Sequence, residues 1–467
     1  MSSYRLLIGG RLVEGKRSLD VRNPATLEML ASASCADQGQ LQEALASAKA
    51  AFRSWESLGI DERANGLACL AGAMQARAEE LARLLTQEQG KPLAEAMMEV
   101  QIACAILGYY AQMRPAPVVI EDNSERLVEA FRFQLGVVAL ITAWNFPLML
   151  LAFKLAPALL AGNTVVCKPA PTTPLTTLKV AELCAEIFPP GVVNVVVDRN
   201  DLGDQLTSHP DIAKISFTGS TATGKKVMAS AALGLKRLTL ELGGNDAAIV
   251  LQDVDPRSVA GHILQGAFTN CGQVCFAIKR LYVHDAIYDA MCEELVSLAR
   301  QAIVGNGLDP GTTMGPLQNR LQYKKAISYF DDAGEHGRVL CGGVEAGPSG
   351  YFVKPAIVAD IKEGCRLVDE EQFCPILPVL RFSSVDEAVE RANATVYGLG
   401  GSVWTPDVAK GREIAARLEA GTVLVNQYIS ALPHIPVGGI KQSGIGVELG
   451  LEGLEEFTRR AIVHSPR

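Results

Sequence analysis

Between residues 135 and 240, short apolar runs alternate with segments that have the periodicity of helices. The runs are rich in valine, isoleucine and leucine, as buried strands are, and the intervening segments are long enough to be helices. Such alternation predicts a parallel, doubly wound sheet covered by helices, with ligands at the carboxyl ends of its strands. The expected strands cover residues 135–143, 164–167, 192–197, 212–217 and 237–240, and the expected helices cover residues 149–160, 176–187, 201–208 and 222–232.

The same pattern restarts after residue 244 and predicts a second α/β unit. Alanine-rich helical periodicity precedes the first sheet, at residues 41–55 and 63–89. The expected strands of the second unit cover residues 247–250, 379–382, 401–403 and 422–426, and its expected helices cover residues 256–269 and 287–304.

A two-stranded excursion is expected after the proline-containing segment 114–117, with strands at residues 118–120 and 127–133. The tail, residues 457–462, has the composition of a further strand with nothing local to pair with. Exposed strand edges usually find a partner, so we expect a homo-oligomer, either a dimer or a tetramer.

Composition and charge exclude several classes of protein. The 467 residues carry a net charge of −8 without a block of Lys or Arg, which argues against nucleic acid and anionic membranes as partners. Residues 135–153 are uncharged and long enough to span a membrane, but the turn at residues 144–147 favours a buried strand and helix instead. Eleven irregularly spaced cysteines, without a secretory leader, predict a cytoplasmic protein without disulfides. No metal-ligand spacing occurs.

Cys275 is the candidate nucleophile. A free cysteine is commonly a small buried hydrophobe, but Cys275 follows Gly272 and Gln273, which would be wasteful inside a core and would let backbone and substrate approach closely. Cys271 competes for the role, and its place before the Gly-Gln pair assigns it to packing or orientation.

Two polar residues at strand ends complete a possible catalytic set. Glu241 follows the apolar strand 238–240, where partial burial would raise its pKa and suit it to activating water. Asn145 lies in a turn and offers an amide donor to a developing oxyanion. A nucleophile, a base and a donor are what oxidation of an aldehyde through a thioester needs.

Residues 215–224 have the pattern of a strand, a glycine turn and a helix start. Backbone N–H groups and hydroxyls at Gly219, Ser220 and Gly224 suit a pyrophosphate at a helix N-terminus. The dinucleotide fingerprint Gly-x-Gly-x-x-Gly is absent, so this pattern by itself does not define the ligand.

Over essentially its whole length the chain resembles the aldehyde dehydrogenase superfamily. The resemblance implies a cofactor domain (residues 1–113 and 135–243), a catalytic domain (residues 244–446) and a bridging module (residues 114–134 and 447–467). The matching motifs are residues 144–147, 168–169, 217–220, 241–244, the run ending at Cys275, 315–317, 370–373, 425–426 and 436–444.

The family resemblance also implies roles for single residues. Cys275 would be the nucleophile and Glu241 the base for deacylation, while Asn145 and the Cys275 backbone N–H would bind the oxyanion. An electropositive site must then favour the thiolate. The cofactor would be NAD or NADP, bound by Trp144, Lys168 (adenosine ribose), Gly219, Ser220 (pyrophosphate), Gly224, Leu242, Glu371 (nicotinamide ribose) and Phe373 (nicotinamide).

Three positions depart from the family pattern. Pro171 stands where many NAD-preferring members carry a glutamate, and Arg199 lies in a nearby loop, so we expect NADP to be accepted. Phe153 stands where relatives that oxidise short carboxylate-bearing semialdehydes place an arginine. An aromatic ring cannot pair with a substrate carboxylate, which favours a neutral aldehyde. Cys374 replaces the usual glycine. Residues expected to line an apolar substrate tunnel are Phe146, Met149, Leu150, Phe153, Phe276, Ile429 and Ala431.

Other readings stay open at this point. The same scaffold supports a semialdehyde dehydrogenase or a CoA-acylating dehydrogenase, although acylating members lack the deacylating carboxylate that Glu241 provides. A catalytically silent cofactor-binding protein would have no need of Cys275, Glu241 and Asn145 together.

Overall fold

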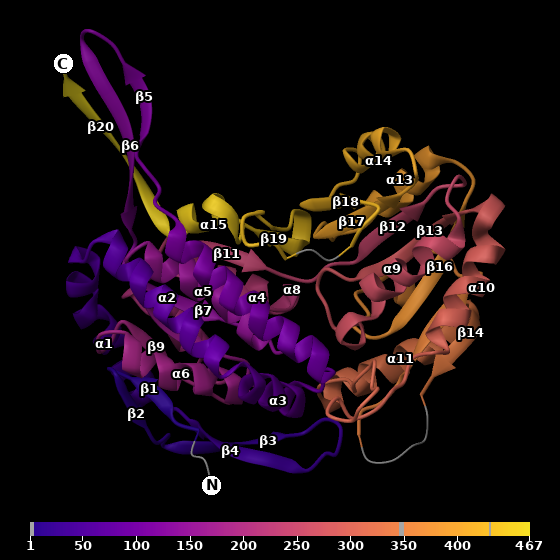
Figure 1. Cartoon of the computed structure of the whole chain (residues 1–467), viewed down its shortest axis with the longest axis horizontal. Coiled ribbons are helices and arrows are strands. Elements are labelled where there is room, and N and C mark those ends of the chain that lie inside the picture. The colour runs from indigo at the N-terminus through magenta and orange to yellow at the C-terminus, as the bar shows by residue number, and fades with distance from the viewer. Residues whose placement is uncertain (1–3, 345–349, 429–430) are drawn as a thin grey trace.

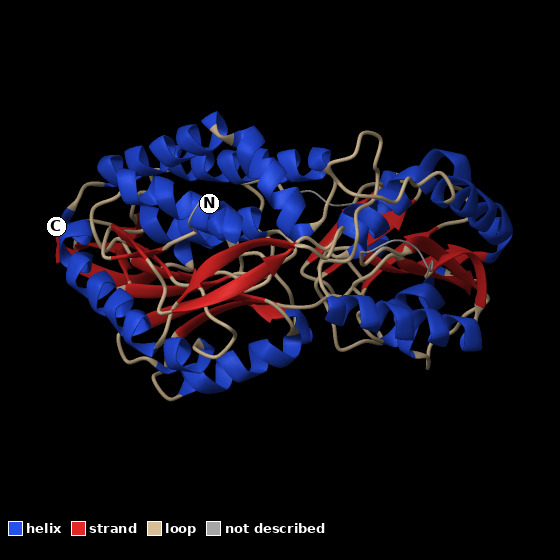
Figure 2. Cartoon of the chain, turned by 90° about the horizontal axis from the view of Figure 1, so that it is seen from below, coloured by secondary structure: helices blue, strands red, loops and turns tan. Residues whose placement is uncertain are grey.

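A computed structural model describes residues 4–344, 350–428 and 431–467. Two α/β halves lie side by side, and in each a central sheet has helices on both faces (Figures 1 and 2). The doubly wound α/β architecture predicted from the alternation of strands and helices is confirmed.

The first half contains an eight-stranded sheet with the order β19-β11-β10-β7-β8-β9-β1-β2. Its five central strands are parallel, and antiparallel strands close both edges. The strands are β1 (Leu6–Ile8), β2 (Arg11–Val13), β7 (Val137–Ile141), β8 (Thr164–Lys168), β9 (Val193–Val195), β10 (Ile212–Thr218), β11 (Arg237–Glu241) and β19 (Gly444–Ile445).

Helices from the N-terminal segment and from the strand connections cover this sheet. The helix expected over residues 63–89 is two helices, because Arg77 leaves helical geometry (φ −109°, ψ 19°) between α2 and α3. The helices are α1 (Gln38–Ser57), α2 (Ile60–Ala76), α3 (Ala78–Gln89), α4 (Leu93–Gln112), α5 (Pro147–Leu160), α6 (Leu175–Ile187), α7 (Gly203–Ser208) and α8 (Thr221–Ala232); a hairpin of β3 (Arg17–Arg22) and β4 (Met29–Cys35) lies beside them.

The second half contains a seven-stranded sheet with the order β14-β15-β16-β13-β12-β17-β18, parallel except for β14. The helix expected to reach Val304 ends at Ala299. The strands are β12 (Asp246–Val250), β13 (Ile278–His284), β14 (Arg338–Gly343), β15 (Lys354–Ala359), β16 (Ile376–Phe382), β17 (Gly400–Trp404) and β18 (Thr422–Val425). The helices are α9 (Pro256–Phe268), η1 (Thr269–Gly272), η2 (Asp285–Ile287), α10 (Tyr288–Ala299), α11 (Arg320–His336), α12 (Arg366–Asp369), α13 (Val385–Asn393), α14 (Val408–Ala415) and η3 (Lys441–Ser443).

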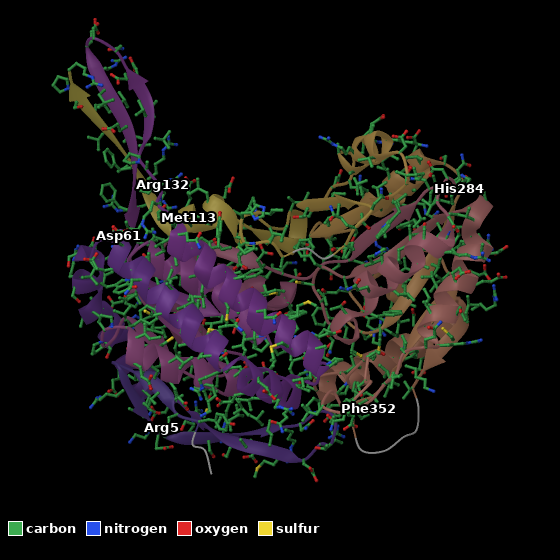
Figure 3. All side chains as sticks on the ribbon, in the orientation of Figure 1. Arg5, Asp61, Met113, Arg132, His284 and Phe352 are labelled. Carbon is green, nitrogen blue, oxygen red and sulfur yellow. The ribbon has the colours of Figure 1, made fainter. Side chains whose placement is uncertain are left out.

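A three-stranded arm projects from the first half (Figure 1). It consists of β5 (Val118–Asp122), β6 (Arg126–Gln134) and the C-terminal β20 (Thr458–Pro466). The strand expected in the tail is present, and its partner is distant in sequence, because β20 pairs with β6 from Thr458 to Pro466. At the base of the arm (Figure 3), Arg132 forms an ion pair with Glu455 of α15 (Gly450–Glu455).

The uncharged stretch 135–153 forms β7, a turn and the first part of α5. In the described ranges, no helix combines the length and the apolar character that crossing a membrane requires.

Candidate active site

A cavity of about 590 Å³ lies where the two halves meet. Its walls come from the turns after β7, β10 and β11, from the segment after η1, from α11 and from the segment after α12. It therefore lies at the carboxyl ends of parallel strands, where the sheet topology predicts a ligand. The lining residues are Ala143, Trp144, Asn145, Thr218, Gly219, Ser220, Leu242, Gly243, Cys275, Gln322, Lys325, Glu371 and Phe373.

Most of the candidate site residues line this one cavity, and three lie outside its walls. Glu241 is buried and directly precedes Leu242, which lines the cavity. Gly224 lies in α8, where a Cβ atom would come within 2.5 Å of the Leu242 side chain, so glycine permits that contact. Lys168 ends β8, and its Nζ lies 2.7 Å from Oδ1 of buried Asp198.

The loop before Cys275 has an unusual backbone. Asn270, Cys271 and Gly272 all have positive φ, and a Cβ atom on Gly272 would lie 2.6 Å from the Cys374 carbonyl oxygen. Gly272 is therefore required by the close approach of backbone. Cys271 is buried in the core of the second half. The loop leaves Cys275 half-buried at the cavity wall.

The burial of Gln273 differs from the sequence interpretation. It was expected to be wasteful inside a core, yet it is fully buried. Its amide donates to the Asn270 carbonyl (2.9 Å) and its Oε1 accepts from the Gln318 N–H (2.9 Å). A buried amide with its hydrogen bonds satisfied stabilises the loop instead of weakening the core.

Asn145 is held against the same loop by hydrogen bonds. Its Nδ2 donates to the Gln273 carbonyl (3.0 Å). Its carbonyl accepts from Nδ2 of Asn270 (3.0 Å) and from Nζ of Lys91 (2.9 Å), which also pairs with Glu99. The amide donor and the nucleophile loop are thus tied together. Sequence reasoning missed Lys91 and Asn270, because nothing local shows that a lysine after α3 reaches a turn after β7.

Glu241 ends β11 in a buried environment. Its Oε1 has no hydrogen-bond partner among the described residues. Burial raises the pKa of Glu241 well above its usual range and the neighbouring Glu448 raises it further, while Lys154 opposes both. Lys154 and Glu448 are themselves a buried ion pair. The raised pKa expected for Glu241 is confirmed, but Glu448 and Lys154 lie far away in sequence and were not anticipated.

Burial and charged neighbours act on the Cys275 thiol in opposite directions. Burial raises the pKa of its thiol to about 12, and Lys279 is the largest influence that lowers it. Glu241 and Glu371 add to the rise. An electropositive group is present in Lys279 and opposes the effect of burial, and a site that favours the thiolate stays a prediction.

The far wall of the cavity is aromatic and acidic. The Trp144 and Phe373 rings meet edge to face with centroids 5.5 Å apart, and Phe373 has a φ of +50°, a strained backbone of the kind that collects at functional sites. Oε1 of Glu371 accepts from the Gly244 N–H (3.0 Å), and a Cβ atom on Gly243 would lie 2.4 Å from Oε2 of Glu371. A side chain at position 243 would therefore displace this carboxylate.

The adenosine end expected near Lys168 has a different charge pattern from the one predicted. Asp198 neutralises Lys168, and the Arg199 guanidinium donates to the Ser18 carbonyl (2.6 Å) in the β3–β4 hairpin. Arg199 is therefore engaged by the hairpin. Asp198 was not singled out in the sequence, where it reads as a solvated loop residue.

The apolar tunnel stays a prediction. Phe153 is buried in the core of the first half, and Nζ of Lys91 lies 3.7 Å from the centroid of the Phe146 ring. Ile429 lies outside the described residues.

No sequence motif predicted that residues of α11 would line the cavity. Gln322 and Lys325 belong to an ordinary polar helix surface, and only the fold brings them to the wall. Nζ of Lys325 donates to the Glu371 carbonyl (2.7 Å).

Comparisons with known proteins agree with this geometry. A model of the aldehyde dehydrogenase family matches residues 12–463. The chain is 39% identical to a phenylacetaldehyde dehydrogenase of Pseudomonas fluorescens (97% of this chain, 94% of that protein) and 38% identical to a mitochondrial succinate-semialdehyde dehydrogenase of Arabidopsis thaliana (97% and 87%). Solved structures include an aldehyde dehydrogenase of Bacillus cereus (36% identity, TM-score 0.97, 99% and 96%) and a betaine aldehyde dehydrogenase of Staphylococcus aureus with NAD+ (33%, 0.96, 99% and 94%).

Proposed function

Because this chain belongs to the aldehyde dehydrogenase family, we propose that Cys275, Glu241 and Asn145 carry its oxidation of an aldehyde to the carboxylic acid. The protein is an oxidoreductase that acts on the aldehyde group with a nicotinamide cofactor. The observation that supports the residue assignment is the single cavity that Cys275 and Asn145 share with Glu371 and Phe373.

The cavity fits a nicotinamide dinucleotide. It combines the Trp144 and Phe373 rings with the acidic Glu371, and the Ser220 side chain caps the N-terminus of α8, where an anionic pyrophosphate is favoured. Glu371 would hold the nicotinamide ribose and Phe373 the nicotinamide, with Ser220 at the pyrophosphate and Lys168 at the adenosine ribose. When bound, the nicotinamide accepts the hydride that the substrate loses.

In the first step, the Cys275 thiolate adds to the carbonyl carbon of the aldehyde. The carbonyl oxygen of the aldehyde then becomes an oxyanion. One hydrogen of the Asn145 amide is engaged by the Gln273 carbonyl, which leaves the other for the oxyanion. The backbone N–H of Cys275 is the second donor. Donors fixed in this way stabilise the developing charge without having to reorganise.

In the second step, a thioester on Cys275 is hydrolysed with Glu241 as the base. A carboxylate whose pKa is raised by burial holds a proton more firmly, which makes it a better base for water than an exposed glutamate. Its unpartnered Oε1 is free to accept that proton.

The variant Cys275→Ala tests the assignment. We expect it to lose aldehyde oxidation, measured as reduced cofactor, while cofactor binding, measured by quenching of tryptophan fluorescence, stays intact. Substantial oxidation by a folded Cys275→Ala protein would remove Cys275 from the mechanism.

We further propose a neutral aliphatic or aromatic aldehyde as substrate. The buried aromatic Phe153 cannot pair with a substrate carboxylate, and a phenylacetaldehyde dehydrogenase is among the relatives. The semialdehyde alternative has its own relative in the Arabidopsis thaliana protein. Comparing kcat/KM for phenylacetaldehyde and succinate semialdehyde separates them, and a strong preference for the second would reverse the proposal.

NADP is proposed as an accepted cofactor beside NAD. The support is Pro171, which has no charge to repel a 2′-phosphate. Arg199 does not support this proposal, because its guanidinium already donates to the Ser18 carbonyl. Titrating both cofactors measures the two dissociation constants, and binding of NAD alone would exclude NADP. In the same assays, formation of free acid without CoA separates this function from the CoA-acylating alternative.

Finally, we propose the three domains defined by sequence and a homodimer or homotetramer assembled through the arm. Apolar side chains are exposed on all three strands of the arm, which favours burial against a second copy. They are Val118, Val119, Ile120, Phe133, Ile462 and Val463. Light scattering of a Val119→Asp variant tests the arm, and an unchanged mass would place the interface elsewhere.

A further inference from the structure

Buried lysines in this protein are almost always paired with a carboxylate. Among the described residues, Lys91, Lys154, Lys168 and Lys214 are buried and each forms an ion pair, whereas buried Lys279 has no carboxylate within the 4.0 Å ion-pair distance. Glu371 and Asp246 act on the Lys279 ammonium without forming a direct ion pair. A buried ammonium without a paired carboxylate is costly and is seldom kept without a use.

The contacts of Lys279 lie around the nucleophile. It is the second residue of β13, and its Nζ donates to the carbonyl of Val274, the residue directly before Cys275. The ammonium also lies 5.4 Å from the centroid of the Phe373 ring, and the Lys279 carbonyl accepts from Nε2 of Gln372 (3.0 Å). Lys279 therefore lies between the Cys275 loop and the Glu371–Phe373 segment.

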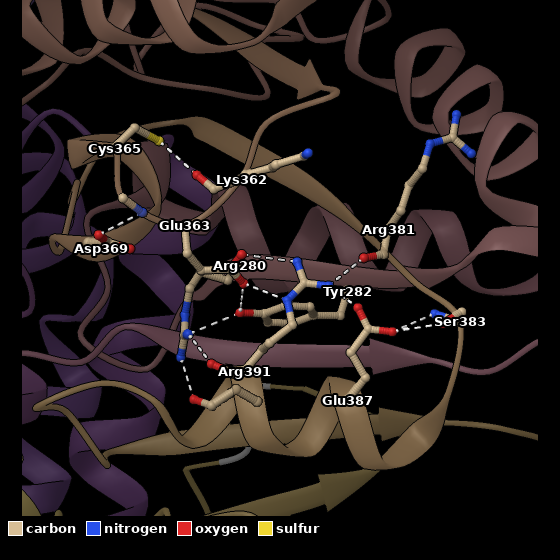
Figure 4. A network of polar contacts seen from close by, with 12 residues as sticks. Arg280, Tyr282, Lys362, Glu363, Cys365, Asp369, Arg381, Ser383, Glu387 and Arg391 are labelled. Carbon is tan, nitrogen blue, oxygen red and sulfur yellow. Dashed lines mark hydrogen bonds and ion pairs between the residues drawn. The ribbon is translucent and has the colours of Figure 1, made fainter.

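The next residue on the strand, Arg280, shows what a purely structural cation looks like in the same place. Its guanidinium donates to the carbonyls of Asn245 (3.0 Å) and Ala392 (2.9 Å) and to the Tyr282 hydroxyl (3.2 Å). Figure 4 shows Arg280 and Tyr282 in this network of polar contacts. The register between β12 and β13 shifts at Lys279, because Asp246 lies opposite Ile278 and the next residue, Ala247, lies opposite Arg280. At this irregularity the Arg280 guanidinium joins the network, while Nζ of Lys279 donates to the nucleophile loop.

We propose that Lys279 is a positioning residue whose positive charge stabilises the Cys275 thiolate. The inference rests on the proposed role of Cys275 as nucleophile and adds the group that makes the thiol ionise. The thiolate, not the thiol, attacks the aldehyde, so a fixed cation beside it increases the reactive fraction.

The charges around Cys275 explain why one cation matters. Glu241 and Glu371 both disfavour a thiolate there, and burial raises the pKa of Cys275 further, to about 12. Lys279 is the largest opposing influence. Burial lowers the pKa of Lys279 itself, and Glu371 is the largest influence that opposes this. Asp246, whose Oδ2 accepts from the Tyr428 hydroxyl (2.7 Å), and the Cys275 and Cys374 thiols act in the same direction as Glu371.

The test measures the Cys275 thiol itself. The full-length variants Lys279→Met and Lys279→Gln, without cofactor, are alkylated with iodoacetamide over a pH series, and modification of the Cys275 peptide is followed by mass spectrometry. A rise of one to two units in the pKa of Cys275 lowers the alkylation rate about 3- to 15-fold near pH 8, since the remaining thiolate becomes somewhat more nucleophilic.

Three comparisons separate charge from structure. Lys279→Arg keeps the charge and should stay within about twofold of wild type. Lys214→Met removes a buried lysine paired with Glu456 and should leave Cys275 alkylation unchanged. The dissociation constant for NAD should also be unchanged in Lys279→Gln, while its kcat/KM for the aldehyde falls in parallel with alkylation.

Wild-type alkylation in both neutral variants would overturn the proposal. So would a loss confined to Lys279→Met, because glutamine keeps a donor for the Val274 carbonyl and the effect would then be one of hydrogen bonding. If neither neutral variant folds, Lys279→Arg decides: slow alkylation of the folded arginine variant would contradict a role for charge. Each of these outcomes is measured as the alkylation rate of the Cys275 thiol. Failure of the Lys279 proposal is therefore distinguishable from failure of the proposed nucleophile, which is tested by turnover of Cys275→Ala.

Discussion

The two halves of the molecule handle a buried lysine beside the reaction centre in opposite ways. In the first half, Lys154 lies next to Glu241 but is paired with Glu448, so a carboxylate remains close to the base. In the second half, Lys279 donates to the residue before Cys275 and acts on its thiol, and it forms no ion pair with a carboxylate among the described residues.

The difference matches the proton that each group must handle. A base is improved by surroundings that hold its proton, which burial and Glu448 provide for Glu241. A nucleophile is improved by surroundings that release its proton, and Lys279 is the group that acts in this direction. Two electrostatic environments thus meet near one cavity: Lys154 of α5 and Glu448 act on Glu241, and Lys279 of β13 acts on Cys275.

The sharpest way to break the comparison is to remove the base. Glu241→Gln should lower steady-state turnover about 10³-fold, because general-base catalysis of this kind contributes about 10²- to 10⁴-fold. The first turnover should survive, since attack by Cys275 does not need Glu241. Rapid-mixing measurements should therefore show a burst of reduced cofactor followed by slow turnover.

An unchanged steady-state rate in Glu241→Gln would mean that some other group activates water. Cys275→Ala is the matched control, because it should abolish the burst as well.

A second change sharpens the comparison by removing the negative neighbour of Glu241. In Glu448→Gln the like charge is gone and Lys154 is left unpaired, so the pKa of Glu241 should fall. The base is active above its pKa, so the acid limb of the deacylation-limited rate should move to lower pH by about one unit. The measurement is a pH profile of kcat.

Glu182→Gln is the control for that profile, because Glu182 pairs with Lys179 on α6 and does not act on Glu241. A shift of the acid limb toward higher pH in Glu448→Gln would contradict the assigned direction of the coupling.

The sequence predicted local features of the site better than its electrostatics. Cys275, Glu241 and Asn145 stand in turns with recognisable glycine and apolar neighbours, so local patterns were enough to find them. Lys279 and Glu448 carry no such mark, because a charged residue in a strand or loop is normally solvated. Their effects depend on burial, which only the packing of distant segments decides.

The fold shows the same division between local and distant information. Strands with continuous apolar runs, such as β7 and β10, were predicted closely. The pairing of β20 with β6 had no local signal, because the two segments are separated by most of the chain, and only the family resemblance placed them in one module. The break at Arg77 was missed because alanine-rich periodicity continues across it.

The smallest expected effect concerns stability, and it follows from the sign of the pKa shift of Glu241. The folded state favours the neutral carboxyl, since burial and Glu448 raise its pKa above the unfolded value. The stability that this group contributes is therefore complete below the unfolded pKa, about 4.3, and is lost as pH rises through the folded pKa.

Glu241→Gln stays neutral and avoids this loss. Its Tm relative to wild type should rise between about pH 5 and pH 8 by roughly 2 °C, an effect of about 1 kcal/mol in a chain of this size. Calorimetry at both pH values measures the difference, and a relative Tm that falls with pH would show that Glu241 is better solvated than its burial indicates.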